Sequence, residues 1–128
     1  MRKKIAIIGS TGSIGKSLLS LLNNEKKNIK IILLVAKKSY KLLLNQAKKF
    51  NAKNLIITDY NSFKISKKKN KNKSIKIYNN FKNLNKIFPK KIDYAMCSIT
   101  GLAGLEPTIE LIKHTKNIAI ANKESIIC

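Results

Sequence analysis

The sequence predicts an α/β fold built on a doubly wound, mainly parallel sheet. Short apolar runs, typical of buried strands, alternate along the chain with segments of helical periodicity. The first run leads directly into three glycines and an amphipathic segment. Polar residues follow several of the runs, at the edge where open parallel sheets bind ligands. We therefore expect one Rossmann-like domain over residues 1–128.

The expected strands and helices alternate from the N-terminus onward. Apolar runs predict strands at residues 3–8, 29–36, 55–58, 92–99 and 118–121, with a minor strand at 74–78. Helical periodicity predicts helices at residues 13–23, 40–51 and 81–88, and a further helix opened by Gly101 and Gly104. Residues 64–74 are mostly lysine and asparagine, and this density of like charge predicts a mobile surface loop.

The glycines lie where the first strand meets the first helix. Gly9, Gly12 and Gly15 are spaced three residues apart, unlike the common G-x-G-x-x-G pattern. Glycine permits a sharp turn, close approach of backbone N–H groups to a pyrophosphate, and tight packing of the helix on the sheet. Phosphate oxygens can also accept hydrogen bonds from the hydroxyls of Ser10, Thr11 and Ser13. A tight turn without a ligand is the alternative, but the strand-then-helix context favours a dinucleotide site.

The end of the second strand indicates which dinucleotide is bound. Sites that prefer NAD usually have an acidic residue about 20 residues past the glycines, where it binds the ribose 2′-hydroxyl. Here the second strand ends in Lys37, Lys38 and Ser39, with no acid. Two ammonium groups and a hydroxyl suit a 2′-phosphate, so the sequence favours NADPH over NADH. The opposing interpretation is that both are ordinary surface lysines in a chain with 27 basic residues.

The formal net charge of +21 points to a nucleic acid or an anionic membrane as a partner. Arg2 is the only arginine, however, and nucleic-acid surfaces depend on arginine for bidentate contacts. The enrichment in Lys, Asn and Ile indicates a codon bias, so we expect only non-specific polyanion binding at low salt. No apolar run reaches membrane-spanning length. Two cysteines give no disulfide framework and the first strand begins close to Met1, so we expect a cytoplasmic protein without a signal peptide.

Four polar segments are expected to meet at one edge of the sheet, because the carboxyl ends of parallel strands lie together. They are residues 9–15, 36–39, 99–104 and 121–125. This convergence is stronger evidence for a site than any single motif.

Four stretches in this order resemble the 1-deoxy-D-xylulose 5-phosphate reductoisomerase family. They are residues 9–15 (GSTGSIG), 34–39 (LVAKKS), 100–108 (TGLAGLEPT) and 121–125 (ANKES). The first occurs in many dinucleotide-binding folds, whereas the last two together are quite specific. The four stretches span nearly the whole chain.

The resemblance implies the activity of the family's enzymes. They rearrange a small-molecule sugar phosphate, 1-deoxy-D-xylulose 5-phosphate, and reduce the product with NADPH to 2-C-methyl-D-erythritol 4-phosphate in non-mevalonate isoprenoid biosynthesis. A divalent metal, magnesium or manganese, holds the substrate oxygens. The complete enzymes are expected to be homodimers. By the family pattern, Lys123 binds substrate, and the cofactor-binding residues are Thr11, Gly12, Ser13, Ile14, Lys37, Lys38, Ser39, Asn122 and Glu124.

This sequence departs from the family in two respects. The family often has Gly at the position of Lys37 and Asn at that of Ser39, so Lys38 is expected to carry the 2′-phosphate specificity. Family members are also much longer, and their metal-binding carboxylates, active-site loop and C-terminal domain would lie beyond Cys128. The resemblance therefore implies no metal ligand and no catalytic residue here, and the chain alone is expected to be inactive.

Two alternatives stay open from the sequence. A different nucleotide-dependent reductase would need a catalytic Cys or a Tyr-x-x-x-Lys pair. Tyr60 and Tyr78 do have lysines at that spacing, but in a lysine-rich region where any spacing is expected. A non-catalytic polyanion-binding module would show steep salt dependence and no nucleotide preference. The single histidine, His114, is expected late in the helix opened by Gly101, as a partner of the helix dipole.

Overall fold

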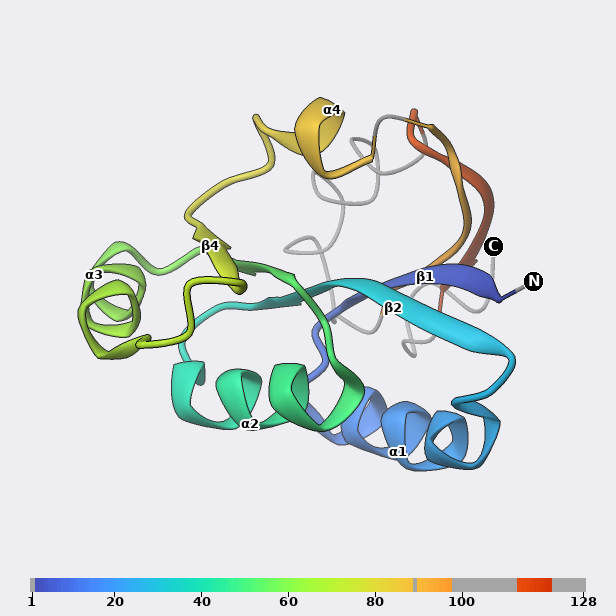
Figure 1. Ribbon diagram of the computed structural model, residues 1–128, viewed down its shortest axis with the longest axis horizontal. Coiled ribbons are helices and arrows are strands. Elements are labelled where there is room, and N and C mark those ends of the chain that lie inside the picture. The colour runs from blue at the N-terminus through green and yellow to red at the C-terminus, as the bar shows by residue number, and fades with distance from the viewer. Residues whose placement is uncertain (1, 89, 98–112, 121–128) are drawn as a thin grey trace.

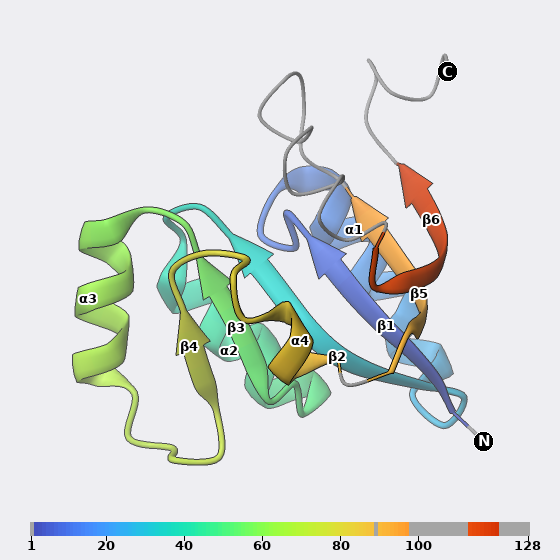
Figure 2. The same ribbon diagram turned by 90° about the horizontal axis from the view of Figure 1, so that it is seen from above.

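The computed structural model describes residues 2–88, 90–97 and 113–120 and confirms the α/β class. In this part of the chain six strands form one sheet in the order β4-β3-β2-β1-β5-β6, and all neighbouring pairs are parallel (Figure 1, Figure 2). The strands are β1 (Lys3–Ile8), β2 (Ile29–Ala36), β3 (Asn54–Ile57), β4 (Lys76–Tyr78), β5 (Ile92–Cys97) and β6 (Thr115–Ile120). The strand order reverses between β1 and β5, which is where sheets of this kind form a ligand crevice.

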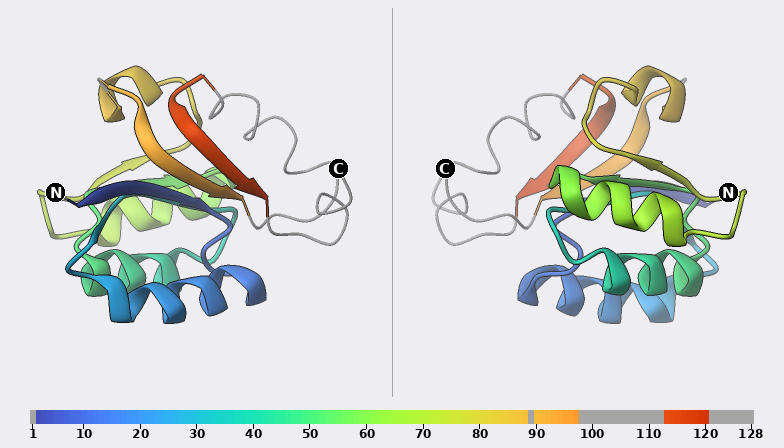
Figure 3. Two further views of the ribbon diagram at one scale, coloured as in Figure 1. Left: turned by 90° about the vertical axis from the view of Figure 1, so that its right-hand side faces the viewer. Right: turned by 90° about the vertical axis from the view of Figure 1, so that its left-hand side faces the viewer.

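Helices lie on both sides of this sheet. Figure 3 shows α1 (Ser13–Leu22) and α2 (Tyr40–Phe50) together on one face and α4 (Leu84–Ile87) on the other. The helix α3 (Tyr60–Lys69) contacts β3 and β4, and a 3₁₀ turn, η1 (Asn23–Glu25), leads from α1 towards β2. Among the described residues, none of the helices is long and apolar enough to cross a bilayer.

Two apolar clusters, one on each face, stabilise the sheet. Ile7 of β1 belongs to the cluster under α1 and α2, with Leu43 of α2. Its neighbour Ile8 belongs to the cluster on the opposite face, with Leu84 of α4. All four side chains are fully buried, and burial of each contributes about 1.5–3 kcal/mol. Strands covered on both faces need apolar residues at successive positions, which explains the unbroken apolar runs of β1 and β2.

Two strands have the predicted boundaries, and others differ from the prediction by up to three residues: β3 (Asn54–Ile57), β4 (Lys76–Tyr78) and β6 (Thr115–Ile120). The expected strands at residues 3–8 and 29–36 are confirmed as β1 and β2. The last strand begins earlier than expected, because Thr115 pairs with Ile92 of β5 and donates its hydroxyl to the carbonyl of Ile92 over 3.4 Å. His114 therefore lies in the turn before β6 and not late in a helix, and its ring centroid lies 6.2 Å from that of Phe88. The helix expected from Gly101 onward lies outside the described residues.

The prediction of a loop over residues 64–74 was wrong for its first half, which belongs to α3. The Asp59 carboxylate caps this helix by accepting hydrogen bonds from the backbone N–H and the hydroxyl of Ser62, over 3.1 and 2.9 Å. The lysines also pack, since the Nζ atom of Lys67 lies 5.4 Å from the ring centroid of Phe63. Lysines in the last turn interact favourably with the helix dipole. These local contacts outweigh the repulsion between like charges.

Asp93 connects three strands at the edge opposite the turn of residues 9–12, which we call the glycine turn. Its Oδ2 atom accepts a hydrogen bond of 2.8 Å from the backbone N–H of Lys4 in β1. Its Oδ1 atom lies 3.7 Å from the Nζ atom of Lys116 in β6. The hydrogen bond from Lys4, followed by the charge of Lys116, lowers the pKa of the Asp93 carboxyl below its ordinary value.

Replacing this carboxyl, in Asp93→Asn, is expected to flatten the acid side of the stability profile. The Asp93 pKa is lower in the folded chain than in the unfolded one. Its contribution is therefore complete above the unfolded value of 3.8 and is lost as the pH falls through the folded value. Urea unfolding at about pH 6 and about pH 2.5 should show a smaller difference for the variant than for the unaltered chain. Equal differences in the two proteins would contradict this role.

Candidate dinucleotide-binding site

The glycine turn joins β1 to α1 at the carboxyl edge of the sheet (Figure 2). Gly9 has a φ angle of 81°, a left-handed conformation that other residues rarely adopt. The N–H groups of Gly9 and Ser10 both donate to the carbonyl oxygen of Val35 in β2, over 2.7 and 3.3 Å. These two bonds hold the turn against the end of β2, next to the lysines that follow that strand.

The start of α1 is suited to binding an anion. Gly12 is the N-cap residue, it is exposed, and no side chain caps the helix. The first backbone N–H groups of a helix have no partner within it, and with the helix dipole they attract negative charge. Gly15 brings this helix close to the turn, because a Cβ atom there would lie 2.1 Å from the carbonyl oxygen of Gly9. The close approach therefore requires glycine at position 15.

The residues expected at the pyrophosphate are mostly accessible. Gly12, Ser13 and Ile14 are exposed and Thr11 is half-buried. Ser10 differs, since it is fully buried and its hydroxyl has no hydrogen-bond partner among the described residues. The Ser10 hydroxyl is therefore not at the surface of the turn, and α1 packs closely on the backbone of this residue. A bond from this hydroxyl to a phosphate stays a prediction.

The segment expected at the 2′-phosphate is exposed and is held by its backbone. The side chains of Lys37, Lys38 and Ser39 are all exposed. The carbonyl oxygen of Lys37 accepts a hydrogen bond of 2.9 Å from the N–H of Asp59, and that of Lys38 accepts one of 2.7 Å from the N–H of Tyr40. Since Ile8 pairs with Val35, this segment and the glycine turn leave neighbouring strands at the same edge. The structure thus brings these two predicted segments together.

Asp59 is an acidic residue near these lysines, and its proximity to them was not predicted from the sequence. Asp59 follows β3 and has a pKa below the ordinary value, chiefly because Ser62 donates to its carboxylate and then because Lys38 and Lys37 lie nearby. The sequence prediction was that no acidic residue follows the second strand, and Asp59 follows the third strand instead. The available signal was the Asp-x-x-Ser spacing directly after the third strand, which is typical of a helix cap at the same edge.

The remaining predicted site residues lie outside the described part of the chain. Asn122, Lys123 and Glu124 and the stretch at residues 100–108 are among them. Their expected convergence with the glycine turn stays a prediction. Within the described residues, no group of three His, Cys, Asp or Glu side chains could hold a metal ion.

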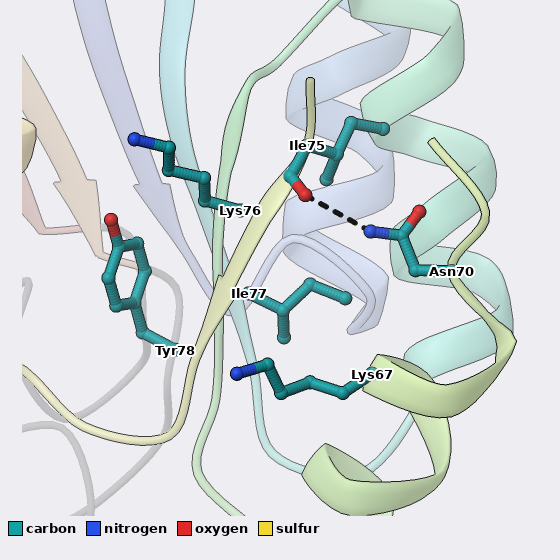
Figure 4. A pocket seen from close by; sticks show the side chains of 6 residues that line it. All are labelled: Lys67, Asn70, Ile75, Lys76, Ile77 and Tyr78. Carbon is teal, nitrogen blue, oxygen red and sulfur yellow. Dashed lines mark hydrogen bonds between the residues drawn. The ribbon is translucent and has the colours of Figure 1, made fainter. Parts of the chain in front are cut away.

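A hollow of about 340 Å³ lies elsewhere, between α3 and β4 (Figure 4). Its lining residues are Lys67, Asn70, Ile75, Lys76, Ile77 and Tyr78. Figure 4 shows Lys76 and Tyr78 on one side of β4 and Ile77 on the other. Two strands, β3 and β2, separate β4 from β1 and its glycine turn. The hollow is therefore not part of the candidate dinucleotide site.

A pair of glycine variants tests the close packing at this site. We expect Gly15→Ala to lower the free energy of unfolding by about 1–3 kcal/mol, because its Cβ atom would overlap the backbone of the turn. Gly12→Ala is the matched control, since its φ angle is −78° and its Cβ atom would lie 3.6 Å from the carbonyl oxygen of Gly9. Urea unfolding measures both. Equal stability of the two variants would rule out the proposed overlap.

Comparison with known proteins places these features in a family. The model of the 1-deoxy-D-xylulose 5-phosphate reductoisomerase family matches residues 5–128. A reductoisomerase of that name from Pelagibacter ubique is 61% identical over 98% of this chain and 33% of its own length. One from Wolbachia pipientis wMel is 39% identical over 98% of this chain and 32% of its own length. The chain thus spans about a third of the length of the curated relatives it matches.

Solved structures of these enzymes share the fold. A Zymomonas mobilis reductoisomerase in complex with NADPH has a TM-score of 0.85 and 31% identity, over 99% of this chain and 34% of its own. A reductoisomerase in complex with NADPH, fosmidomycin and magnesium has a TM-score of 0.83 and 26% identity, over 98% of this chain and 31% of its own. The sequence match over residues 5–128 and the structural match agree, and the chain belongs to the 1-deoxy-D-xylulose 5-phosphate reductoisomerase family.

Proposed function

We propose that this chain forms the NADPH-binding part of a 1-deoxy-D-xylulose 5-phosphate reductoisomerase. The observation that carries the proposal is the pairing of β1 with β2, which sets the N-terminus of α1 beside the exposed Lys37 and Lys38. A ligand with two separated phosphate groups fits two positive positions on one edge. The solved Zymomonas mobilis enzyme, described in complex with NADPH, supports the choice of this dinucleotide.

In this proposal the glycine turn holds the pyrophosphate. Thr11, Ser13 and Ile14 supply backbone N–H groups at the positive end of α1, together with the hydroxyls of Thr11 and Ser13. The N–H of Gly12 donates to the carbonyl oxygen of Gly9 over 3.2 Å, so Gly12 contributes through its missing side chain. Gly12 has no side chain, so a phosphate can approach the backbone closely. The missing side chain of Gly15 keeps the helix near the turn.

The adenosine 2′-phosphate would lie against Lys37, Lys38 and Ser39. Ammonium groups form charge-assisted hydrogen bonds with phosphate, which are stronger than neutral ones. The Asp59 carboxylate reduces the local positive charge, but its Oδ2 atom already accepts two hydrogen bonds from Ser62. Lys37 and Ser39 stand where the family often has Gly and Asn, so we assign the main 2′-phosphate contact to Lys38.

The rest of the enzyme's chemistry is proposed from family membership. Bound NADPH would supply the hydride that reduces the rearranged sugar phosphate. We assign Asn122 and Glu124 to cofactor binding and Lys123 to substrate binding. The described residues contain no group of carboxylates, cysteines and histidines that fits a metal ion, although a solved reductoisomerase is described with magnesium. Homodimer formation and a cytoplasmic location belong to the same proposal.

Family membership decides between the alternatives that the sequence left open. The match to residues 5–128 excludes the different nucleotide-dependent reductase that the sequence left open. Since the chain spans about a third of its relatives, we expect it to bind NADPH without turning over the sugar phosphate. Metal-dependent oxidation of NADPH by the purified chain would contradict that expectation.

Titration of the purified chain with NADPH and NADH tests the proposal. We expect tighter binding of NADPH, and about tenfold weaker binding in Lys38→Gln because one charge-assisted hydrogen bond is lost. NADH affinity should change by less than about twofold, because that cofactor lacks the 2′-phosphate. Isothermal titration calorimetry at moderate salt measures these affinities.

Lys30→Gln is the matched control for this titration. Lys30 is exposed and lies at the start of β2, whereas Lys37 and Lys38 follow the end of that strand. Lys30→Gln removes one positive charge, as Lys38→Gln does, but far from the site. Its NADPH affinity should therefore stay close to that of the unaltered chain. Equal losses in both variants, or equal affinity for the two nucleotides, would instead support general polyanion binding driven by the net charge of +21.

A further inference from the structure

A buried amide reaches the glycine turn from a distant part of the sequence. Gln46 lies on α2 and its side chain is nine-tenths buried. Its Nε2 atom donates a hydrogen bond of 2.9 Å to the backbone carbonyl of Ser10, 36 residues earlier. The other buried residues of α2 are Leu43 and Ala47, so Gln46 is the polar member of an otherwise apolar face.

Gln46 satisfies a backbone group of the turn while one of its own atoms stays unpaired. Its Oε1 atom is buried and has no hydrogen-bond partner within the described residues. A buried polar atom without a partner costs about 1–3 kcal/mol. An apolar side chain of similar volume would avoid that cost, but it would leave the Ser10 carbonyl without the bond from Nε2. The specific effect of a glutamine at this position is therefore on the turn.

That bond completes the attachment of the turn to the second βα unit. The N–H of Ser10 donates to Val35 of β2, and the carbonyl of Ser10 accepts from Gln46 of α2. The peptide groups on both sides of Ser10 are thus held by β2 and α2. The segment between these two elements contains Lys37 and Lys38.

We propose that Gln46 is a positioning residue for the pyrophosphate end of the cofactor site. By holding the carbonyl of Ser10 inward, it directs the backbone from Thr11 to Ser13 towards the ligand. It also fixes the distance between the glycine turn and the 2′-phosphate segment. Gln46 is buried and makes no contact with the cofactor itself. The inference rests on the proposed binding of NADPH at this edge.

The test compares two ligands on Gln46→Met, which keeps the length of the side chain and removes its hydrogen bond. NADPH has both the pyrophosphate and the 2′-phosphate, whereas adenosine 2′-monophosphate has only the latter. We expect NADPH to bind about tenfold more weakly, as for the loss of one buried hydrogen bond. Adenosine 2′-monophosphate should bind within about twofold of the unaltered chain, because Lys37 and Lys38 are untouched. Calorimetry and NMR titration of the purified chain measure the two affinities.

Asn45→Leu is the matched control, because it removes the neighbouring amide on α2 from an exposed position. It should leave both affinities unchanged. If Gln46→Met shows no cooperative unfolding transition, Gln46→Asn replaces it. That variant keeps an amide but shortens the side chain by one methylene, so the bond to Ser10 is lost while a polar group remains.

The outcomes separate this inference from the proposed function. Unchanged NADPH affinity in the Gln46 variant would overturn the positioning role. An equal loss for both ligands would also overturn it, because Gln46 would then support only the fold of the second βα unit. No binding of NADPH by the unaltered chain would overturn the proposed function, and the inference with it. A loss confined to NADPH supports both.

Discussion

The contact between α1 and the turn before it determines where the rest of the site lies. With no side chain at Gly15, the helix packs directly on the backbone of Gly9 and Ser10. This contact sets the positive end of the α1 dipole at the edge where β1 and β2 end. The hydrogen bonds from Gly9 and Ser10 to Val35 then connect that helix end to the lysines after β2. The pairing of β1 with β2 gives the two positive positions a common edge, and the contact at Gly15 holds α1 against the turn there.

Features encoded by neighbouring residues could be predicted from the sequence. β1 and β2 were predicted correctly because strands covered on both faces need continuous apolar runs, and these are visible locally. The glycine turn was predicted correctly because the spacing of Gly9, Gly12 and Gly15 is also visible locally. α3 was missed because its stability comes from the Asp59 cap and from lysine packing on Phe63, not from apolar periodicity. The bond from Gln46 joins residues far apart in sequence, so no local pattern indicated it.

The charges around Lys37, Lys38 and Ser39 also could not be predicted from neighbouring residues alone. In NAD sites the acidic residue follows the second strand, and here Lys37, Lys38 and Ser39 lie between β2 and α2. In the sheet, β3 lies beside β2 and delivers Asp59 to the same edge. The N–H of Asp59 also donates a hydrogen bond to the carbonyl oxygen of Lys37. Because β2 and β3 pair in parallel, the lysines after β2 lie near a charged residue that follows β3 and is distant from them in sequence.

The lysines over aromatic rings change what the high basic content means for this protein. Lysine Nζ atoms lie 5.0 to 6.0 Å from the ring centroids of Tyr40, Phe50, Tyr60 and Phe63. Lysine stems of this kind cover apolar surface while their charged ends stay in water. In this lysine-rich chain, lysine side chains thus cover part of the aromatic rings near the surface. Part of the positive charge is then a by-product of covering the fold and not a signal for a partner.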